Sequence, residues 1–140
     1  MKLYQTQIKL AAKSRGVHLI TQEILEKTEG LGKIKTGLFK VFIKHTSAGV
    51  CINESADPSV RTDFETHFNK MVPENQSYYT HTQEGPDDMP AHIKSTLFGT
   101  SLEIPITNGK LNLGTWQGIY LGEFRNEASA RSLVITIIGE

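Results

Sequence analysis

The sequence contains a single cysteine, Cys51, and no excess of charge of either sign. Cys51 cannot form a disulfide within its own chain, and its apolar neighbours Val50 and Ile52 are typical of a thiol that packs as a small hydrophobic side chain. Fifteen basic and fifteen acidic residues cancel, so the chain lacks the broad positive surface that attracts polyanions. We therefore expect neither a disulfide scaffold nor a nucleic-acid partner.

Long apolar runs are also missing. No segment approaches the roughly 20 apolar residues that span a bilayer, so we expect no membrane partner. The first residues, Met1 to Gln5, lack the apolar core of a signal peptide, which favours a cytoplasmic location. The patterns G-x-G-x-x-G and G-x-x-x-x-G-K-[ST] are absent, which argues against dinucleotide-binding and P-loop enzymes.

The length of 140 residues suits one domain, spanning residues 1–140, with its own hydrophobic core. Alternating apolar residues predict a first strand at residues 4–11. Asp57 and Pro58 are typical of a helix start, and Asn108-Gly109 is typical of a tight hairpin turn. We expect further strands at 38–43, 50–52, 100–106, 110–113, 117–124 and 133–138, and helices at 22–28, 58–71 and 91–98. This order predicts an α+β fold with a mixed, largely antiparallel sheet.

Residues 73–90 form the longest stretch without a predicted helix or strand. The segment is rich in Pro, Asn, Gln, Ser, Thr and acidic residues, and loops of this length in compact domains are usually functional or disordered. It carries four groups with useful chemistry, namely His81, Glu84, Asp87 and Asp88. We expect this loop to contribute to a functional site.

Three of the five histidines, His45, His81 and His92, lie at the edges of polar, turn-forming segments. Neutral imidazole is a common ligand of divalent metals, and catalytic sites usually combine three protein ligands with one open position. These histidines are therefore the candidate metal ligands, whereas His18 and His67 are expected to be ordinary packed or surface residues. Their spacing matches no compact metal motif such as H-E-x-x-H.

Other polar residues complete the candidate site. Glu54 and Glu84 are candidate general bases, and Ser47 is a candidate hydroxyl nucleophile, although the chain has no G-x-S-x-G motif. A phosphate could be held by amides of the Thr46-Ser47 turn and by scattered cations. The candidate cations are Lys44, Lys94, Arg125 and Arg131. Trp116, the only tryptophan, lies among glycines and is either a core or interface residue or a platform for a ring of the substrate.

The motifs taken in order resemble the YjbQ-like family, also called the secondary thiamine-phosphate synthase family. The resemblance covers nearly the whole chain and rests mainly on three blocks of sequence. They are His45-Thr46-Ser47-Ala48, Asp87-Asp88-Met89-Pro90-Ala91-His92-Ile93-Lys94 and Gly114-Thr115-Trp116-Gln117-Gly118-Ile119-Tyr120-Leu121. The resemblance implies a compact α+β pseudo-barrel that assembles as a homotrimer, with its histidine-rich pocket close to subunit contacts.

The resemblance also implies roles for individual residues. It assigns the metal to His45, His81 and His92, and it assigns polar pocket positions to Thr46, Ser47, Asn53, Glu54 and Arg131. Many relatives have Gly-Asn-Ala in place of Asp87-Asp88-Met89, which restricts a role for either aspartate to one branch of the family.

The implied activity is the condensation of a hydroxymethylpyrimidine diphosphate with a thiazole phosphate to give thiamine phosphate. Such a reaction needs a divalent cation on the leaving diphosphate and donors for the second phosphate, and the pyrimidine could rest on Trp116 or Tyr120. Histidine ligands favour zinc, whereas magnesium prefers oxygen ligands and remains the second choice. Two alternatives stay open: zinc-assisted hydrolysis of a small substrate, with Glu54 or Glu84 as the base, and a non-catalytic trimer that binds a small ligand.

Overall fold

The computed structural model describes all 140 residues and contains two antiparallel sheets and three α-helices, which confirms the predicted α+β class. The five-stranded sheet has the order β1-β8-β3-β5-β6, and the three-stranded sheet has the order β2-β7-β4. Every strand pair is antiparallel. No helix is long and apolar enough to cross a membrane.

The strands are β1 (Lys2–Lys9), β2 (Gly16–Leu19), β3 (Thr36–Ile43), β4 (Ala48–Glu54), β5 (Ser101–Thr107), β6 (Lys110–Leu111), β7 (Gln117–Glu123) and β8 (Ser132–Gly139). The helices are α1 (Thr21–Lys27), α2 (Pro58–Met71) and α3 (Asp88–Phe98), with a 3-10 turn at Leu31–Lys33. The short strand β2 was not predicted, because four residues are too few to show a clear alternation.

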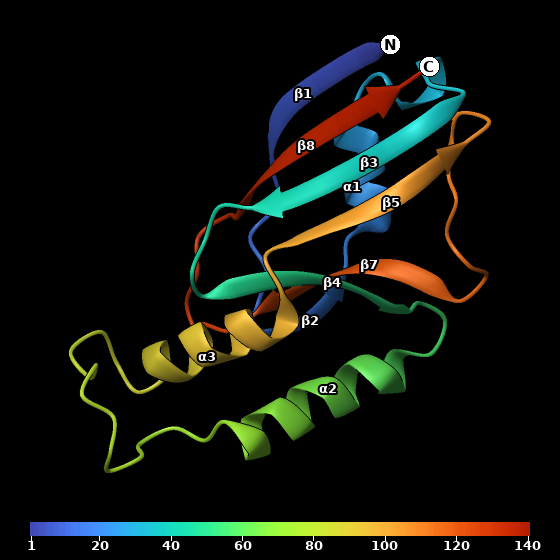
Figure 1. Cartoon of the computed structure of the whole chain (residues 1–140). Helices are drawn as coiled ribbons and strands as arrows, with labels where there is room; N and C mark the ends of the chain where they lie inside the picture. Colours follow the sequence, from blue (N-terminus) through green and yellow to red (C-terminus); the bar gives the residue numbers. More distant parts are fainter.

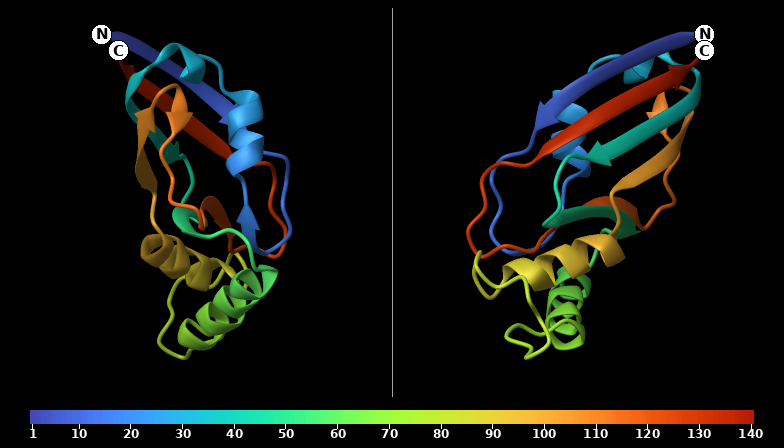
Figure 2. Two further views of the ribbon diagram at one scale, coloured as in Figure 1. Left: turned by 90° about the vertical axis from the view of Figure 1, so that its right-hand side faces the viewer. Right: turned by 60° about the vertical axis from the view of Figure 1, so that its left-hand side comes forward.

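The three-stranded sheet lies between the five-stranded sheet and the pair of helices α2 and α3 (Figure 1). Strand β7 is consequently buried along almost its whole length. One apolar core fills the space between the two sheets and includes Ile24 of α1, and a smaller one joins Phe98 of α3 and Tyr120 of β7. Helix α1 covers one face of the five-stranded sheet, whereas no helix covers the opposite face (Figure 2).

Two segments bring the candidate residues together, namely the turn between β3 and β4 and the helix α3. The turn between β3 and β4 contains His45, Thr46 and Ser47, and helix α3 packs on β4 beside it. Gly49 permits this close approach, because a Cβ atom there would lie 2.8 Å from the carbonyl oxygen of Gly99 and 3.0 Å from the Cβ of Phe98. The middle of α3 therefore lies against the turn, where His92 and Ser95 contact the Thr46 carbonyl.

Candidate functional site

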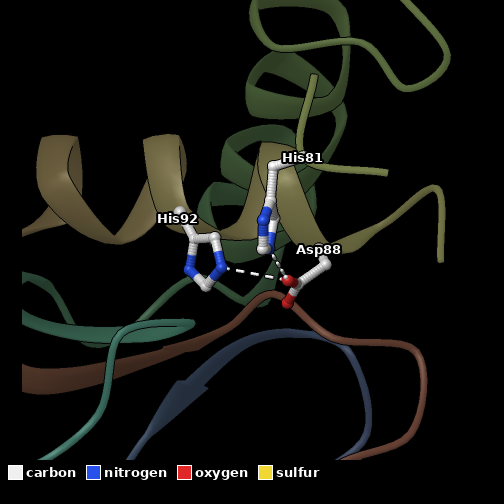
Figure 3. Close-up of side chains that lie close together, drawn as sticks. All are labelled: His81, Asp88 and His92. Carbon is white, nitrogen blue, oxygen red and sulfur yellow. Dashed lines mark hydrogen bonds and ion pairs between the residues drawn. The ribbon is translucent and has the colours of Figure 1, made fainter. Parts of the chain in front are cut away.

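His81, Asp88 and His92 converge at the N-terminal end of α3 (Figure 3). Asp88 and His92 are four residues apart on the helix, so their side chains project from the same face, and His81 reaches them from the loop between α2 and α3. The Nε2 atoms of His81 and His92 lie 2.7 Å and 3.0 Å from the same oxygen, Oδ2 of Asp88. The three potential ligand atoms all lie within 4.8 Å of one another.

Arg125 holds the carboxylate of Asp88 in place. Its Nη1 donates to Asp88 Oδ1, its Nε donates to Asp87 Oδ2 at 2.9 Å, and its Nη2 donates to the carbonyl of Glu84 at 3.0 Å. Burial raises the pKa of Asp88, but the hydrogen bond from His81 and the charges of His92 and Arg125 outweigh burial and lower the pKa below its ordinary value. Asp88 is therefore an ionised carboxylate with Oδ2 directed at both histidines.

The ring of His92 is oriented by the turn between β3 and β4. Its Nδ1 lies 2.8 Å from the carbonyl oxygen of Thr46, which can only accept, so Nδ1 carries the proton. In the neutral imidazole Nε2 then has a free lone pair, which points at Asp88 Oδ2. Two acceptors facing each other at 3.0 Å repel unless a proton or a cation lies between them.

This donor set fits a divalent ion. Two ligands each about 2.1 Å from one ion lie roughly 3.0 to 3.4 Å apart. The 3.0 Å between Asp88 Oδ2 and His92 Nε2 falls in this range, whereas the 2.7 Å to His81 Nε2 is shorter and would lengthen around an ion. The donation from His92 to a backbone carbonyl is one of the interactions that orient metal-binding histidines. Two imidazoles and one carboxylate leave room for water or substrate on the ion.

His45, the remaining predicted metal ligand, lies outside this cluster. Its Nε2 accepts the backbone N–H of Ser132 at 2.8 Å, and its Nδ1 lies 3.4 Å from Nη1 of Arg131. Both ring nitrogens therefore face donors of the protein. Asp88, which the resemblance restricted to one branch of the family, is the third member of the cluster with His81 and His92.

Arg131 is buried rather than free to bind a phosphate through its whole fork. Its Nε and Nη2 each donate to the fully buried carboxylate of Glu123 at 2.6 Å, and Nη2 also donates to Ser47 Oγ at 2.9 Å. Only Nη1 remains, and it faces His45. The interaction with Arg131 also means that Ser47 is not paired with a histidine as a hydrolase serine would be.

The other predicted phosphate-binding cations are engaged elsewhere. Arg125 pairs with Asp87 and Asp88, Lys94 is fully buried and donates to Asn69 at 2.6 Å, and Lys44 donates to Gln7 at 3.0 Å.

Asn53, Glu54 and Trp116 lie at the opposite end of β4 from the histidines. Strand β4 runs from Ala48 to Glu54, and at about 3.3 Å per residue these ends are roughly 20 Å apart. The Glu54 carboxylate accepts the backbone N–H groups of Ala56 and Asp57 at the start of α2, and Trp116 is exposed. The chain does not bring these three predicted site residues to the cluster, whereas Glu84 lies in the same loop as His81.

A polar pocket adjoins the cluster. It has a volume of about 480 Å³ and no hydrophobic residue in its wall. Its lining residues are His45, Thr46, His92, Ser95, Thr96 and Thr100. A slightly larger pocket of about 520 Å³ lies between β1 and Lys27–Glu29, but it contains no histidine. We place the candidate functional site at the polar pocket, because His92 of the cluster lines it together with His45.

Comparison with known proteins agrees with this fold. The chain is 51% identical over 137 residues to the UPF0047 protein YjbQ of Salmonella typhimurium, a match that covers 98% of this chain and 99% of the relative. It is 44% identical over 137 residues to a UPF0047 protein of Synechocystis, covering 98% of this chain and 92% of the relative.

Among solved structures, it is similar to a protein of unknown function from Sulfolobus solfataricus, with a TM-score of 0.84, 27% identity and 99% of both chains covered. A Clostridium acetobutylicum protein of the same family gives a TM-score of 0.79 at 36% identity, with 96% of this chain and 99% of the other covered. The family model described as UPF0047 protein YjbQ-like matches residues 6–140. The chain therefore belongs to the YjbQ-like UPF0047 family.

Proposed function

We propose that the protein is a metal-dependent enzyme in which His81, Asp88 and His92 hold one divalent ion, and that it acts on a small phosphorylated substrate. The observation that carries the proposal is the convergence of Nε2 of His81 and Nε2 of His92 on Oδ2 of Asp88, with Nδ1 of His92 committed to the Thr46 carbonyl. A cation bound by these three atoms would replace the proton that otherwise joins His92 to Asp88.

The ligand set favours zinc. Two imidazole nitrogens and one carboxylate oxygen form a three-ligand site of the kind that zinc enzymes use, whereas magnesium prefers oxygen ligands and retains several waters. A bound ion would supply Lewis acidity toward an oxygen of the substrate. Magnesium is the second candidate in this proposal.

The reaction to test first is the condensation of hydroxymethylpyrimidine diphosphate with thiazole phosphate that the sequence resemblance implies. In that step a carbon–nitrogen bond forms to the thiazole nitrogen while the bond from the pyrimidine methylene to diphosphate breaks. The substrates carry phosphate groups, and the adjoining pocket is lined only by histidine and hydroxyl side chains. Trp116 is too distant within one chain to carry the pyrimidine ring.

Hydrolysis of a phosphorylated substrate is the second candidate reaction. It is favoured by Glu84, an exposed carboxylate three residues after His81 whose side chain makes no hydrogen bond or ion pair in the structure. A carboxylate that reached a metal-bound water from this loop could accept its proton.

The proposed functional unit is a homotrimer. The exposed face of the five-stranded sheet aligns Leu3 of β1, Ile138 of β8 and Leu38 of β3 in one row, and Leu3 and Leu38 are exposed. Self-association would cover this apolar row and protect the sheet. Light scattering should give the mass of three 15.6 kDa chains, and a monomer at micromolar concentration would contradict this part of the proposal.

The experiment uses protein purified without a histidine tag. Elemental analysis should find close to one zinc per chain, and both reactions should be assayed before and after chelation. His81→Ala and Asp88→Ala should lose metal and turnover together, whereas His67→Ala, which changes an exposed histidine on α2, should retain both. A wild-type protein that binds no divalent metal would refute the proposed function.

A further inference from the structure

His45 has an unusual combination of neighbours for a histidine that is expected to bind metal. Ser132 donates its backbone N–H to Nε2 at 2.8 Å, and a backbone amide cannot accept in return. The neutral ring must therefore carry its proton on Nδ1. Burial and the charge of Arg131 lower the pKa of His45, although Glu123 opposes them, which is consistent with a neutral ring.

Arg131 places a second hydrogen-bond donor, Nη1–H, beside the Nδ1–H group of His45. Its Nε and Nη2 are occupied by Glu123 and Ser47, so Nη1 is the only part of the guanidinium left for another partner. Nη1 lies 3.4 Å from His45 Nδ1, but both atoms carry hydrogen and neither can accept from the other. Arg131 is 9% exposed, so its donors are largely shielded from water. An oxygen placed between the two groups would accept from both.

The surroundings suit an anionic oxygen. His45 lines the polar pocket that also contains His92, and the hydroxyl groups of Thr46 and Thr100 in the same wall make no hydrogen bond in the structure. The salt bridge to Glu123 fixes the orientation of Arg131 from behind. Hydrogen-bond donors held rigidly and shielded from water are the usual means of binding phosphate oxygens.

We propose that Nδ1–H of His45 and Nη1–H of Arg131 form a two-donor clamp that binds a phosphate group of the substrate beside the cluster of His81, Asp88 and His92. The inference rests on the proposed function, because it identifies how the phosphorylated substrate of that site is held. It assigns His45 to substrate binding instead of metal binding. A guanidinium 3.4 Å from Nδ1 would repel a divalent ion there, and Nε2 is already engaged by Ser132.

Phosphate binding to metal-free protein tests the clamp separately from the metal. Protein stripped with a chelator is titrated calorimetrically with inorganic phosphate. His45→Phe removes the donor and should weaken phosphate binding at least about tenfold. His45→Gln should restore affinity to within about threefold of wild type, because its amide can accept from Ser132 and donate to phosphate.

Two variants separate the clamp from the metal site. His81→Ala should lose zinc and keep the phosphate affinity of the metal-free protein, whereas His45→Phe should keep zinc and lose phosphate. If the wild-type protein binds no zinc but binds phosphate normally, the proposed function is refuted. The clamp is not refuted by that result.

The wild-type protein provides a test that does not depend on a variant folding. Nitrogen NMR of the imidazoles should show the Nδ1–H form for His45, and added phosphate should shift that Nδ1–H resonance. An Nε2–H form, a His45→Phe variant with unchanged phosphate affinity, or a folded His45→Phe variant that has lost its zinc would overturn the proposal.

Discussion

The Nδ1–H of His92 donates to the backbone carbonyl oxygen of Thr46 across 2.8 Å, although the two residues are 46 positions apart in the sequence. The same carbonyl accepts from Ser95 Oγ at 2.8 Å, so the turn between β3 and β4 is attached to α3 at two points. This contact fixes which nitrogen of His92 faces Asp88. The packing of α3 on the three-stranded sheet thus determines the chemistry of the candidate metal centre.

Arg125→Lys should weaken zinc binding about 10- to 100-fold without unfolding the protein, because a lysine cannot hold Asp87, Asp88 and the Glu84 carbonyl at once. Competition with a chromogenic chelator measures the affinity. Lys44→Gln removes a positive charge next to His45 without touching Asp88 and should bind zinc as wild type does. Equal zinc affinity in Arg125→Lys and wild type would mean that Arg125 does not position the carboxylate.

Glu123→Gln should lower the free energy of unfolding by about 3 kcal/mol, because it leaves the charge of Arg131 buried without its partner. The side chains of Glu123 and Arg131 are 0% and 10% exposed, and two contacts of 2.6 Å join them. Urea denaturation measures the effect, and the exposed Glu127→Gln is the matched control. A loss below about 1 kcal/mol would show that water reaches the pair.

Glu23→Gln should reduce stability at neutral pH by on the order of 2 kcal/mol, with allowance for partial exposure. Burial raises the pKa of Glu23, but donations from Lys13, the backbone of Ala11 and Lys27 outweigh it and lower the pKa from 4.5 to about 2. A depressed carboxylate pKa contributes stability that is fully present above pH 4.5 and is lost as the pH falls toward 2. Acid denaturation curves of the variant should be flatter than wild type in that range, and identical curves would contradict the assignment.

Lys94→Met should leave the free energy of unfolding at pH 7 unchanged or raise it by about 1 kcal/mol. Lys94 is fully buried, and burial and the charge of Arg15 lower its pKa. In the pH range between the lowered pKa of the folded protein and the unfolded value near 10.4, Lys94 binds more protons in the unfolded chain than in the folded one. The free energy of unfolding of the wild type should therefore rise with pH in this range, and the variant should show no such rise. Denaturation at several alkaline pH values tests it, and a destabilisation above about 2 kcal/mol at pH 7 would refute it.

Local signals in the sequence were sufficient for most of the fold. Asn108 and Gly109 both adopt positive φ in the β5–β6 hairpin, and Asp57 caps α2 through the N–H of Ser59, as predicted. The start of α3 was predicted too late. Pro90 lies in the first turn of the helix, where the missing N–H of proline costs nothing, so α3 begins at Asp88 instead of residue 91.

The earlier start of α3 explains why Asp88 was not predicted to lie with His81 and His92. If Asp88 lies in a loop, the sequence does not define where its side chain lies relative to His92. Inside a helix, a spacing of four residues places both side chains on one face. Glu123 could not be identified from the sequence, because its partner Arg131 is brought to it only by the tertiary fold. Conversely, His45 and Glu54 are near in sequence, yet the extended β4 separates them.

The location of the metal tests the account most directly. Crystals grown with zinc should show one anomalous diffraction peak per chain, about 2.0 to 2.2 Å from Nε2 of His81, Nε2 of His92 and Oδ2 of Asp88, with His45 still bonded to Ser132. A zinc peak coordinated by His45, or a fully occupied zinc site elsewhere with none between His92 and Asp88, would contradict the assignment.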